Sequence, residues 1–289
     1  MLRWRVGAVT ITRILEIEGF GEVTDIFPEG SPEKLKRVSW LCPDFADEKG
    51  RFKGSSHALI IETPSRRIVV DTCWGNDKQA LPAMFRPFQR LKTSFLDDFE
   101  KAGFDRRSID TVLCTHLHVD HIGWNTMLID GDWVPTFPNA RYLIGRGEYE
   151  HWLREGAEWV VLSESIAPIL DAGVVDFVEP NHLLCEEVRL VPTPGHTPHH
   201  VSVLITSRGE NAIITGDFIH HPAQMAYPEW WTPFDSDRAQ AIATRRKMLG
   251  ELSGSPTLMI GTHFPSPTGG YVVPEGQSYR LANPRGKTR

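Results

Sequence analysis

The stretch THLHVDHIG, residues 115–123, places three histidines and an aspartate within six positions. His116 and His118 are two residues apart, so in an extended or turning backbone their side chains point to the same side. Asp120 and His121 follow after a further turn and can face a second centre. Imidazole nitrogen together with carboxylate oxygen suits zinc, and also manganese or iron, better than calcium. The cluster therefore predicts a metal site, with histidines that hold no metal as the alternative.

Metal-capable residues also follow three later apolar strands. RLVPTPG leads to His196, AIITG to Asp217 and TLMIGT to His263, just as TVLCT leads to His116. Strand ends are rigid places from which side chains can be aimed at one point. Chance easily explains one such residue but not four, so we expect these side chains to converge.

Strands and helices alternate through both halves of the chain. Strands are expected at 6–17, 57–63, 67–71, 110–115, 188–193, 201–206, 212–216 and 257–261, helices at 93–103 and 236–252, and a strand followed by a helix at 140–155. This alternation predicts an α/β layered domain, and no clean linker divides residues 1–289. Residues 20–56 are expected to be a loop-rich extension that forms a subunit contact or an active-site cover. Residues 270–289 are expected to be a polar, partly mobile tail.

The composition is that of an ordinary globular protein. Its 289 residues are 40% hydrophobic and 24% charged, with a net charge of −6, which is enough for one domain with a substantial core. No basic block favours a nucleic-acid partner. The start of the chain lacks a secretory signal pattern, and no apolar run approaches the roughly 20 residues of a membrane-spanning helix. We expect a cytoplasmic protein that acts on a small molecule, with its four scattered cysteines reduced.

The combined motif resembles that of the metallo-β-lactamase fold superfamily, over about residues 57–264. Its His-x-His-x-Asp-His signature is matched by His116, His118, Asp120 and His121. The resemblance implies a four-layer αββα sandwich with a dinuclear metal site at the sheet edge. It also implies the ligands: His116, His118 and His196 for one metal, Asp120, His121 and His263 for the other, with Asp217 as the bridge. Asp71 matches an aspartate of the family that would orient a ligand imidazole from behind.

The mechanism expected from this site is hydrolytic. Asp120 and Asp217 offset only part of the charge of two divalent ions, so the metal pair stays strongly electrophilic. Water between the ions should lose a proton near neutral pH and attack as a bridging hydroxide. Asp120 could orient the hydroxide or carry its proton to the leaving group, so Asp120 and Asp217 are the expected catalytic residues. Zinc is the expected metal, and manganese or iron also fits these ligands.

The stretch GDFIHHPAQMAYPEWWTPFDSD, residues 216–237, resembles the methyl parathion hydrolase and lactonase-like branch of this superfamily. Aromatic side chains beside the metals would suit a neutral, fairly apolar substrate. Packing of the loop alone is the alternative for each of them. The candidate pocket residues are Trp124, Phe218, His220, Tyr227, Trp230 and Trp231.

The sequence thus favours a homodimeric, dinuclear metal-dependent hydrolase of a small lactone, carboxylic ester or phosphotriester. A mononuclear iron oxygenase of the same fold is the second hypothesis, and one bound iron per chain would support it. A β-lactam hydrolase is less favoured, because the main zinc class of these enzymes has a cysteine where Asp217 stands. A protein in which metal only supports folding is a further alternative, which predicts loss of the fold on chelation and no turnover.

Overall fold

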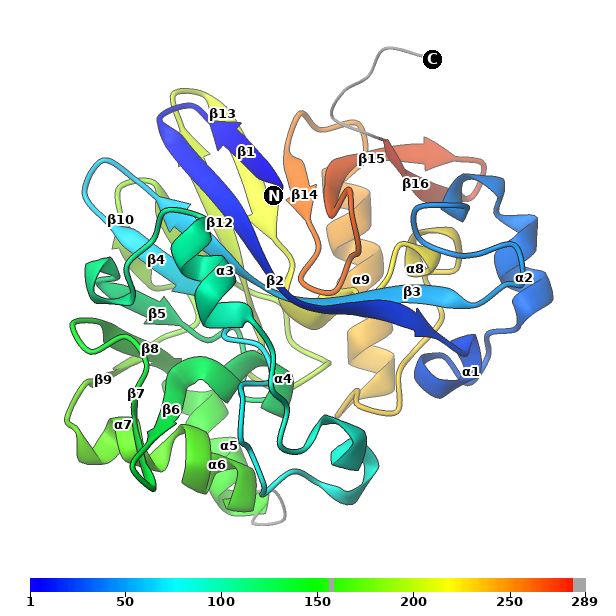
Figure 1. Cartoon of the computed structure of the whole chain (residues 1–289). Helices are drawn as coiled ribbons and strands as arrows, with labels where there is room; N and C mark the ends of the chain where they lie inside the picture. Colours follow the sequence, from blue (N-terminus) through cyan, green and yellow to red (C-terminus); the bar gives the residue numbers. More distant parts are fainter. Residues whose placement is uncertain (156–158, 283–289) are drawn as a thin grey trace.

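The structure, a computed structural model, describes residues 1–155 and 159–282 (Figure 1). Two seven-stranded sheets and a small hairpin, β6 (Thr126–Ile129) and β7 (Asp132–Pro135), make up its strands. In spatial order the first sheet contains β1 (Arg3–Val6), β2 (Val9–Gly21), β3 (Phe52–Glu62), β4 (Arg67–Val70), β5 (Thr111–Leu113), β8 (Arg141–Gly145) and β9 (Val175–Val178). The second contains β10 (Leu183–Cys185), β11 (Val188–Pro192), β12 (Val201–Ser207), β13 (Glu210–Ile214), β14 (Leu258–Ile260), β15 (Gly269–Glu275) and β16 (Ser278–Ala282).

Helices cover the outer faces of both sheets (Figure 1). The α-helices are α1 (Val23–Ile26), α2 (Pro32–Arg37), α3 (Phe95–Lys101), α4 (Val119–Ile122), α5 (Arg146–Glu155), α6 (Trp159–Ser165), α7 (Ala167–Asp171), α8 (Ala223–Ala226) and α9 (Arg238–Leu252). Short 3₁₀ segments are η1 (Ser39–Leu41), η2 (Ala83–Phe88), η3 (Arg106–Ser108), η4 (Gly123–Asn125) and η5 (Gly216–Phe218). Among the described residues, no helix is both long and apolar enough to cross a membrane.

Alternating side chains on the strands bind the four layers together. In β4, Ile68 and Val70 face the apolar core between the two sheets, while Val69 faces the core under the first helical layer. In β14, Met259 points the other way from its neighbours and packs in the same core as Leu249 of α9. Strands buried on both faces read as continuous apolar runs because each face contacts its own layer. The predicted αββα sandwich is therefore confirmed.

The strands that lead to the candidate ligands end at one edge of the sandwich. In the first sheet β4 pairs in parallel with β5, and in the second β13 pairs in parallel with β14. Strand β11 is antiparallel to β12, which is antiparallel to β13, so β11 runs in the same direction as β13. The carboxyl ends of parallel strands meet at the same edge, where loops on a rigid scaffold commonly carry function.

The extension at residues 20–56 is more ordered than expected. Strands β2 and β3 pair as far as Gly21 and Phe52, and they form a long arm that carries α1 and α2 to the side of α8 and α9 (Figure 1). The side chains of Phe27, Leu35 and Phe45 are buried there against the chain's own second helical layer. A homodimer contact through this segment stays a prediction.

The expected polar tail at 270–289 is wrong for residues 270–282. They belong to the antiparallel pair β15–β16, with Val272 and Leu281 buried under the second helical layer. Burial alternates along both strands, with Val272 between half-buried Tyr271 and Val273 and with Leu281 after exposed Arg280, so one face of the pair packs on the core. Residues 283–289 lie outside the described part of the chain.

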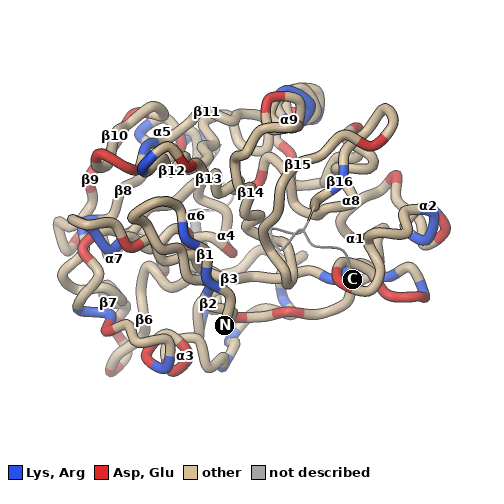
Figure 2. The backbone as a smooth tube through the Cα atoms, turned by 90° about the horizontal axis from the view of Figure 1, so that it is seen from above, with Lys and Arg blue, Asp and Glu red and all other residues tan. Residues whose placement is uncertain are grey.

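Figure 2 shows acidic and basic residues side by side on α2, α3 and α9.

The packing of the extension can be tested through Phe27. We expect Phe27→Ala to lower the free energy of unfolding by about 3–5 kcal/mol, because it removes a fully buried ring. Chemical denaturation followed by tryptophan fluorescence measures this change. The control is Phe20→Ala, which truncates a half-exposed ring on the same arm and should cost less than about 1 kcal/mol. Equal losses in the two variants would contradict a core role for the extension.

Candidate metal centre

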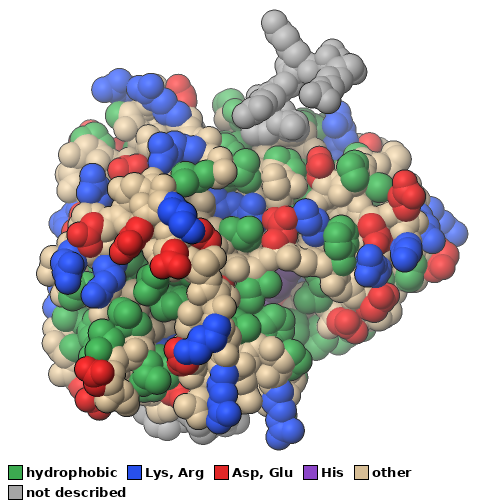
Figure 3. Space-filling model, viewed as in Figure 1, with side chains coloured by type: hydrophobic (Ala, Val, Ile, Leu, Met, Phe, Trp, Pro, Cys, Tyr) green, Lys and Arg blue, Asp and Glu red, His purple; other side chains and the backbone are tan. Residues whose placement is uncertain are grey.

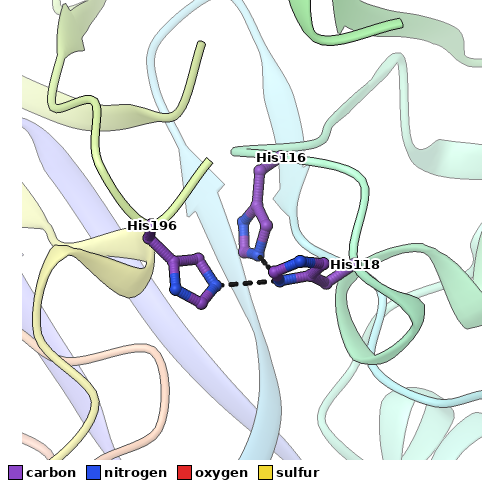
Figure 4. A group of neighbouring side chains, drawn as sticks. All are labelled: His116, His118 and His196. Atoms are coloured by element: carbon purple, nitrogen blue, oxygen red, sulfur yellow. Dashed lines mark hydrogen bonds between the residues drawn. The ribbon is translucent and has the colours of Figure 1, made fainter. Parts of the chain in front are cut away.

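Three histidines from two loops meet at one point (Figure 4). Nε2 of His116 lies 3.0 Å from Nδ1 of His118, and that atom lies 2.8 Å from Nε2 of His196. His116 follows β5, His118 stands just before α4, and His196 comes from the loop after β11. The pKa values of His116 and His118 lie well below the usual range for histidine. Burial is the larger cause, and the nearby imidazoles are the smaller one. Both imidazoles are therefore neutral, which is the form that binds a metal.

A second group lies beside the first. Asp120, His121 and His263 bring one ligand atom each to within 4.8 Å of one another. Nε2 of His263 lies 3.2 Å from Nε2 of His121 and 3.5 Å from Oδ2 of Asp120. Asp120 and His121 belong to α4, whereas His263 comes from the loop after β14. The sheet edge thus brings ligands from both sheets to each group.

Asp217, in the turn η5 after β13, stands between the two groups. Its Oδ2 atom approaches Nε2 of four histidines, two from each group. The distances are 3.9 Å to His116, 3.3 Å to His121, 3.4 Å to His196 and 3.2 Å to His263. A single carboxylate oxygen within reach of both groups can bridge two ions. The structure thus brings together all seven residues that the sequence singled out as ligands.

Asp71, expected to orient one of the ligand imidazoles, lies behind His121. Its Oδ2 accepts from Nδ1 of His121 at 2.9 Å, and its carboxylate also accepts from the backbone and hydroxyl of Thr115. The backbone at Asp71 is left-handed (φ 54°), an uncommon conformation for a non-glycine residue. The loop after β4 is held against α4 by the bonds Thr72 N–H to His121 O and Gly123 N–H to Cys73 O. Asp71 therefore fixes both the tautomer and the place of His121.

Two further supports of the ligands carry no signal that the sequence analysis recognised. Oδ1 of Asp235 accepts from Nδ1 of His196 at 2.9 Å, and its other oxygen accepts from the backbone of Thr232. The backbone oxygen of Ser55 accepts from Nδ1 of His263 at 3.0 Å. With these Nδ1–H groups engaged, the Nε2 atoms of His196 and His263 are the ring nitrogens that face the centre. The FDSD sequence that contains Asp235 supported the resemblance to the lactonase-like branch, but it did not indicate that Asp235 supports a ligand.

The charges of the site also fit divalent cations. Burial opposes charge on His263, but Asp217 and Asp120 outweigh it and raise the pKa of His263 to about 9. Burial likewise opposes the charge of Asp217, yet the surrounding histidines hold its pKa well below the usual range. Oδ1 of Asp217 is buried without a hydrogen-bond partner in the described chain. A cation between the ligand nitrogens and this buried carboxylate would satisfy it, so the residues present fit two metal ions.

The six predicted pocket residues lie in different surroundings. Trp124, Phe218 and Trp230 lie in the core clusters, less than 5% exposed, and not on the wall of the site. Their rings are held inward by core partners: Trp124, for example, stacks on Phe95 and donates its indole N–H to Glu16. A continuous core below the loops therefore takes up aromatics that the sequence assigned to a pocket.

The other three candidates lie closer to the surface or to the metals. Tyr227 stacks on Trp230 and donates its hydroxyl to the backbone of Lys34, so its hydrogen bond is already used. Trp231 is half-buried beneath the guanidinium of Arg238. His220 does reach the centre, with Nε2 3.3 Å from Oδ2 of Asp217.

Histidines that the sequence analysis left out of the site have structural partners. His57 is buried and bonds to the hydroxyl of Ser55 and the backbone of Gly261. His200 is also buried, and its Nε2 accepts from the backbone N–H of Asp217. This bond steers the turn that carries the bridging carboxylate. Cys114 is a small buried side chain that bonds to Asn125 in the core.

An aromatic group unforeseen from the sequence joins the two halves of the molecule beside the metal centre. Trp74, three residues after Asp71, stacks on Phe88 with ring centroids 4.1 Å apart and contacts Phe85. Phe85 in turn contacts Phe234, the neighbour of Asp235, at 5.5 Å. Figure 3 shows a histidine at the bottom of a hollow bordered by hydrophobic side chains. Solvent reaches the second group of ligands, because the side chains of His263 and Asp120 are 17% and 19% exposed.

The fold and this centre define a protein of the metal-binding hydrolase type. The family described as the Metallo-beta-lactamase superfamily matches residues 51–253. The chain belongs to this superfamily, and the resemblance stated from the sequence is confirmed.

Named relatives agree with the lactonase-like branch, and solved structures share the fold. An N-acyl homoserine lactonase from Bacillus sp. is 27% identical over 226 residues, covering 75% of this chain and 84% of that protein. A crystal structure of the hydrolase AbOPH "in beta lactamase superfamily" superposes with a TM-score of 0.80 at 24% identity, over 99% of this chain and 98% of that one. AidC, described as a dizinc quorum-quenching lactonase in complex with a product, gives 0.76 at 22% identity, over the same shares of the two chains.

Asp235 provides a test of the ligand supports. We expect Asp235→Ala to weaken metal binding by about 10–100-fold, because Nδ1 of His196 loses the partner that fixes its tautomer. Chelator competition followed by metal analysis measures this affinity. Asp132→Ala, which removes an exposed carboxylate on the β6–β7 hairpin, is the control and should bind metal as the unchanged chain does. Unaltered affinity in Asp235→Ala would show that the bond to His196 does not matter for the metal.

Proposed function

We propose that this protein is a dinuclear metal-dependent hydrolase that cleaves a small lactone, carboxylic ester or phosphotriester. The observation that carries the proposal is the position of Asp217, whose one oxygen lies within 3.9 Å of ring nitrogens from both ligand groups. A one-metal centre would need only one of these groups. Zinc is the proposed metal, since histidine and carboxylate ligands suit it and AidC is described as a dizinc enzyme.

When bound, the two ions supply a nucleophile derived from water near neutral pH and polarise the bond under attack. The residues of the chain then divide the remaining tasks. Asp217 holds the two positions at a fixed spacing, and its burial keeps water from competing with that role. Asp120, partly exposed at the edge of the second group, is placed to orient the attacking water and to pass a proton to the leaving oxygen.

His220 faces the same space from the far side of Asp217. Its ring is parallel to that of His263 at 6.0 Å and meets the ring of His196 edge-on at 4.6 Å. With neither ring nitrogen bonded within the described residues, it can donate to an oxygen of a bound substrate. Such a donor, aimed at a developing negative charge, stabilises the transition state.

The aromatic group points to the apolar part of the substrate. Trp74, Phe85, Phe88 and Phe234 link the loop after Asp71 to the loop that carries Asp235, and both of these aspartates support a ligand histidine. A neutral substrate with an acyl or aryl substituent would bury that substituent here, while its ester or lactone bond lies at the metals. The relatives named N-acyl homoserine lactonase make an acylated lactone the first substrate to try.

The proposed chemistry can be tested on three substrate classes in parallel. We expect the zinc-loaded protein to hydrolyse an N-acyl homoserine lactone, an aryl ester or an aryl phosphotriester, with turnover abolished in Asp217→Ala. Initial rates and metal content are measured on the same preparations. A chain that binds two zinc ions but turns over none of the three would refute the substrate class. One iron per chain with oxygen uptake would instead support the oxygenase hypothesis.

A second test separates a substrate contact from a metal ligand. We expect His220→Ala to lower kcat by about 100-fold while both metals stay bound, because it removes a donor that acts on the substrate. His182→Ala, in the turn before β10, is the matched histidine control and should keep the full rate. Loss of one metal equivalent in His220→Ala would show that this residue is a ligand and not a substrate contact.

A further inference from the structure

A buried glutamate that no motif includes lies between two of the ligand loops. Glu148 is on α5 and is 1% exposed. Its Oε1 atom accepts from the backbone N–H of Leu117 at 3.3 Å and from the indole N–H of Trp152 at 2.9 Å. Its Oε2 atom accepts from the hydroxyl of Thr197 at 2.8 Å. Both oxygens of the buried carboxyl group are thus in use.

Two of these partners are neighbours of metal ligands. Leu117 stands between His116 and His118, and Thr197 directly follows His196. The loops that carry them come from different sheets, after β5 and after β11. One side chain of a third element, α5, therefore joins the two loops that form the three-histidine group.

Trp152, one helical turn beyond Glu148, strengthens the same corner. Its ring meets that of His118 edge-on with centroids 5.4 Å apart, while its N–H holds the glutamate. Residues four apart on a helix lie on the same face, so α5 presents both side chains to the site together. The helix acts as a clamp on this group of ligands.

The energetics show that Glu148 is not an ordinary core residue. Burial raises its pKa, and the bonds from Trp152, Thr197 and Leu117 offset only part of that effect. No lysine or arginine of the described chain forms an ion pair with it. A buried carboxyl group without a cation is costly compared with an apolar side chain of similar size. Its position is therefore explained by the two loops that it joins.

We propose that Glu148 is a positioning residue that sets the spacing of the 116–118 and 196–197 loops and thereby the affinity of the three-histidine metal position. The second position has other supports: Asp71 holds His121, and the backbone of Ser55 holds His263. Removing Glu148 should therefore weaken one of the two ions and spare the other. This inference rests on the proposed dinuclear site, but not on the identity of the substrate.

The hydrogen-bond pattern provides a conservative variant. Both partners of Oε1 are N–H donors, whereas the partner of Oε2 is a hydroxyl, which can also accept. A glutamine can therefore keep all three bonds, with its oxygen facing Leu117 and Trp152 and its amide N–H₂ facing Thr197. Alanine keeps none of them. Glu150, exposed on the same helix, offers a matched control.

The experiment compares Glu148→Ala, Glu148→Gln and Glu150→Ala with the unchanged full-length chain. Stepwise Zn²⁺ dissociation constants are measured by chelator competition. Cobalt(II) absorption then shows which position is vacated, because a three-histidine ligand set and a carboxylate-containing set give different spectra. We expect Glu148→Ala to raise one dissociation constant by about 10–100-fold, at the three-histidine position. Glu148→Gln should stay within about threefold of the unchanged chain, and Glu150→Ala should not change either constant.

Three outcomes would overturn the inference. Unchanged zinc affinity in a folded Glu148→Ala would mean that the bridge does not act on the metal. Equal weakening of both positions would mean a general loss of packing. Equal damage in Glu148→Gln would mean that charge, and not the bridge, matters.

If Glu148→Ala does not fold, Thr197→Val removes only the bond to Oε2 and should weaken the same position by a smaller factor. Unchanged affinity in this variant would also count against the bridge. Since zinc binding is measured without substrate, a wrong substrate class leaves the result intact. An unchanged chain that binds no second zinc would instead refute the proposed dinuclear site.

Discussion

The structure depends above all on one buried negative charge, the carboxylate of Asp217, surrounded by imidazole nitrogens. Its Oδ2 lies 3.2–3.9 Å from ring nitrogens of five histidines, four of which come from three other loops and one, His220, from its own loop. Such a charge is stable in a protein interior only if cations or protons compensate it. The strands β4, β5, β11, β13 and β14 all end at one edge of the sandwich. Their ends bring the charged and ligand side chains together from distant parts of the chain.

The ligand loops are held by neighbours that are themselves fixed in the core. The loop after β4 is bonded to the α4 turn, where a side chain at Gly123 would meet the backbone of Trp74 at 1.9 Å. Glycine is thus required for this contact, which places Asp71 behind His121. Asp235 and Ser55 support the other loops in the same manner. Geometry at the centre is therefore determined by contacts one residue further out.

Much of this arrangement could be predicted from the sequence. Four apolar strands are followed by His116, His196, Asp217 and His263. These strands predicted the layers, and the direction of the strands predicted where the ligands meet. Asp235, Ser55 and Glu148 could not be found in the same way, since their roles depend on contacts between loops far apart in the chain. The prediction that Phe218 and Trp230 line the pocket was wrong for a related reason. The residue types in a loop do not tell whether a ring packs into the core or faces the site. The β15–β16 pair and the helices of the extension were likewise hidden in polar, loop-like sequence.

The arm formed by β2 and β3 has a consequence for how enzymes of this shape diversify. It carries Phe27 and Phe45 into the same core as Trp230, and His221 bonds to the backbone of Phe45. The N-terminal extension and the loop after Asp217 therefore pack as one unit, although Phe45 and His221 are 176 residues apart in the sequence. Exchanging only the loop after Asp217 would place its buried side chains, such as Trp230, against an extension whose residues do not match them. Exchange of specificity between relatives would require both segments to move together.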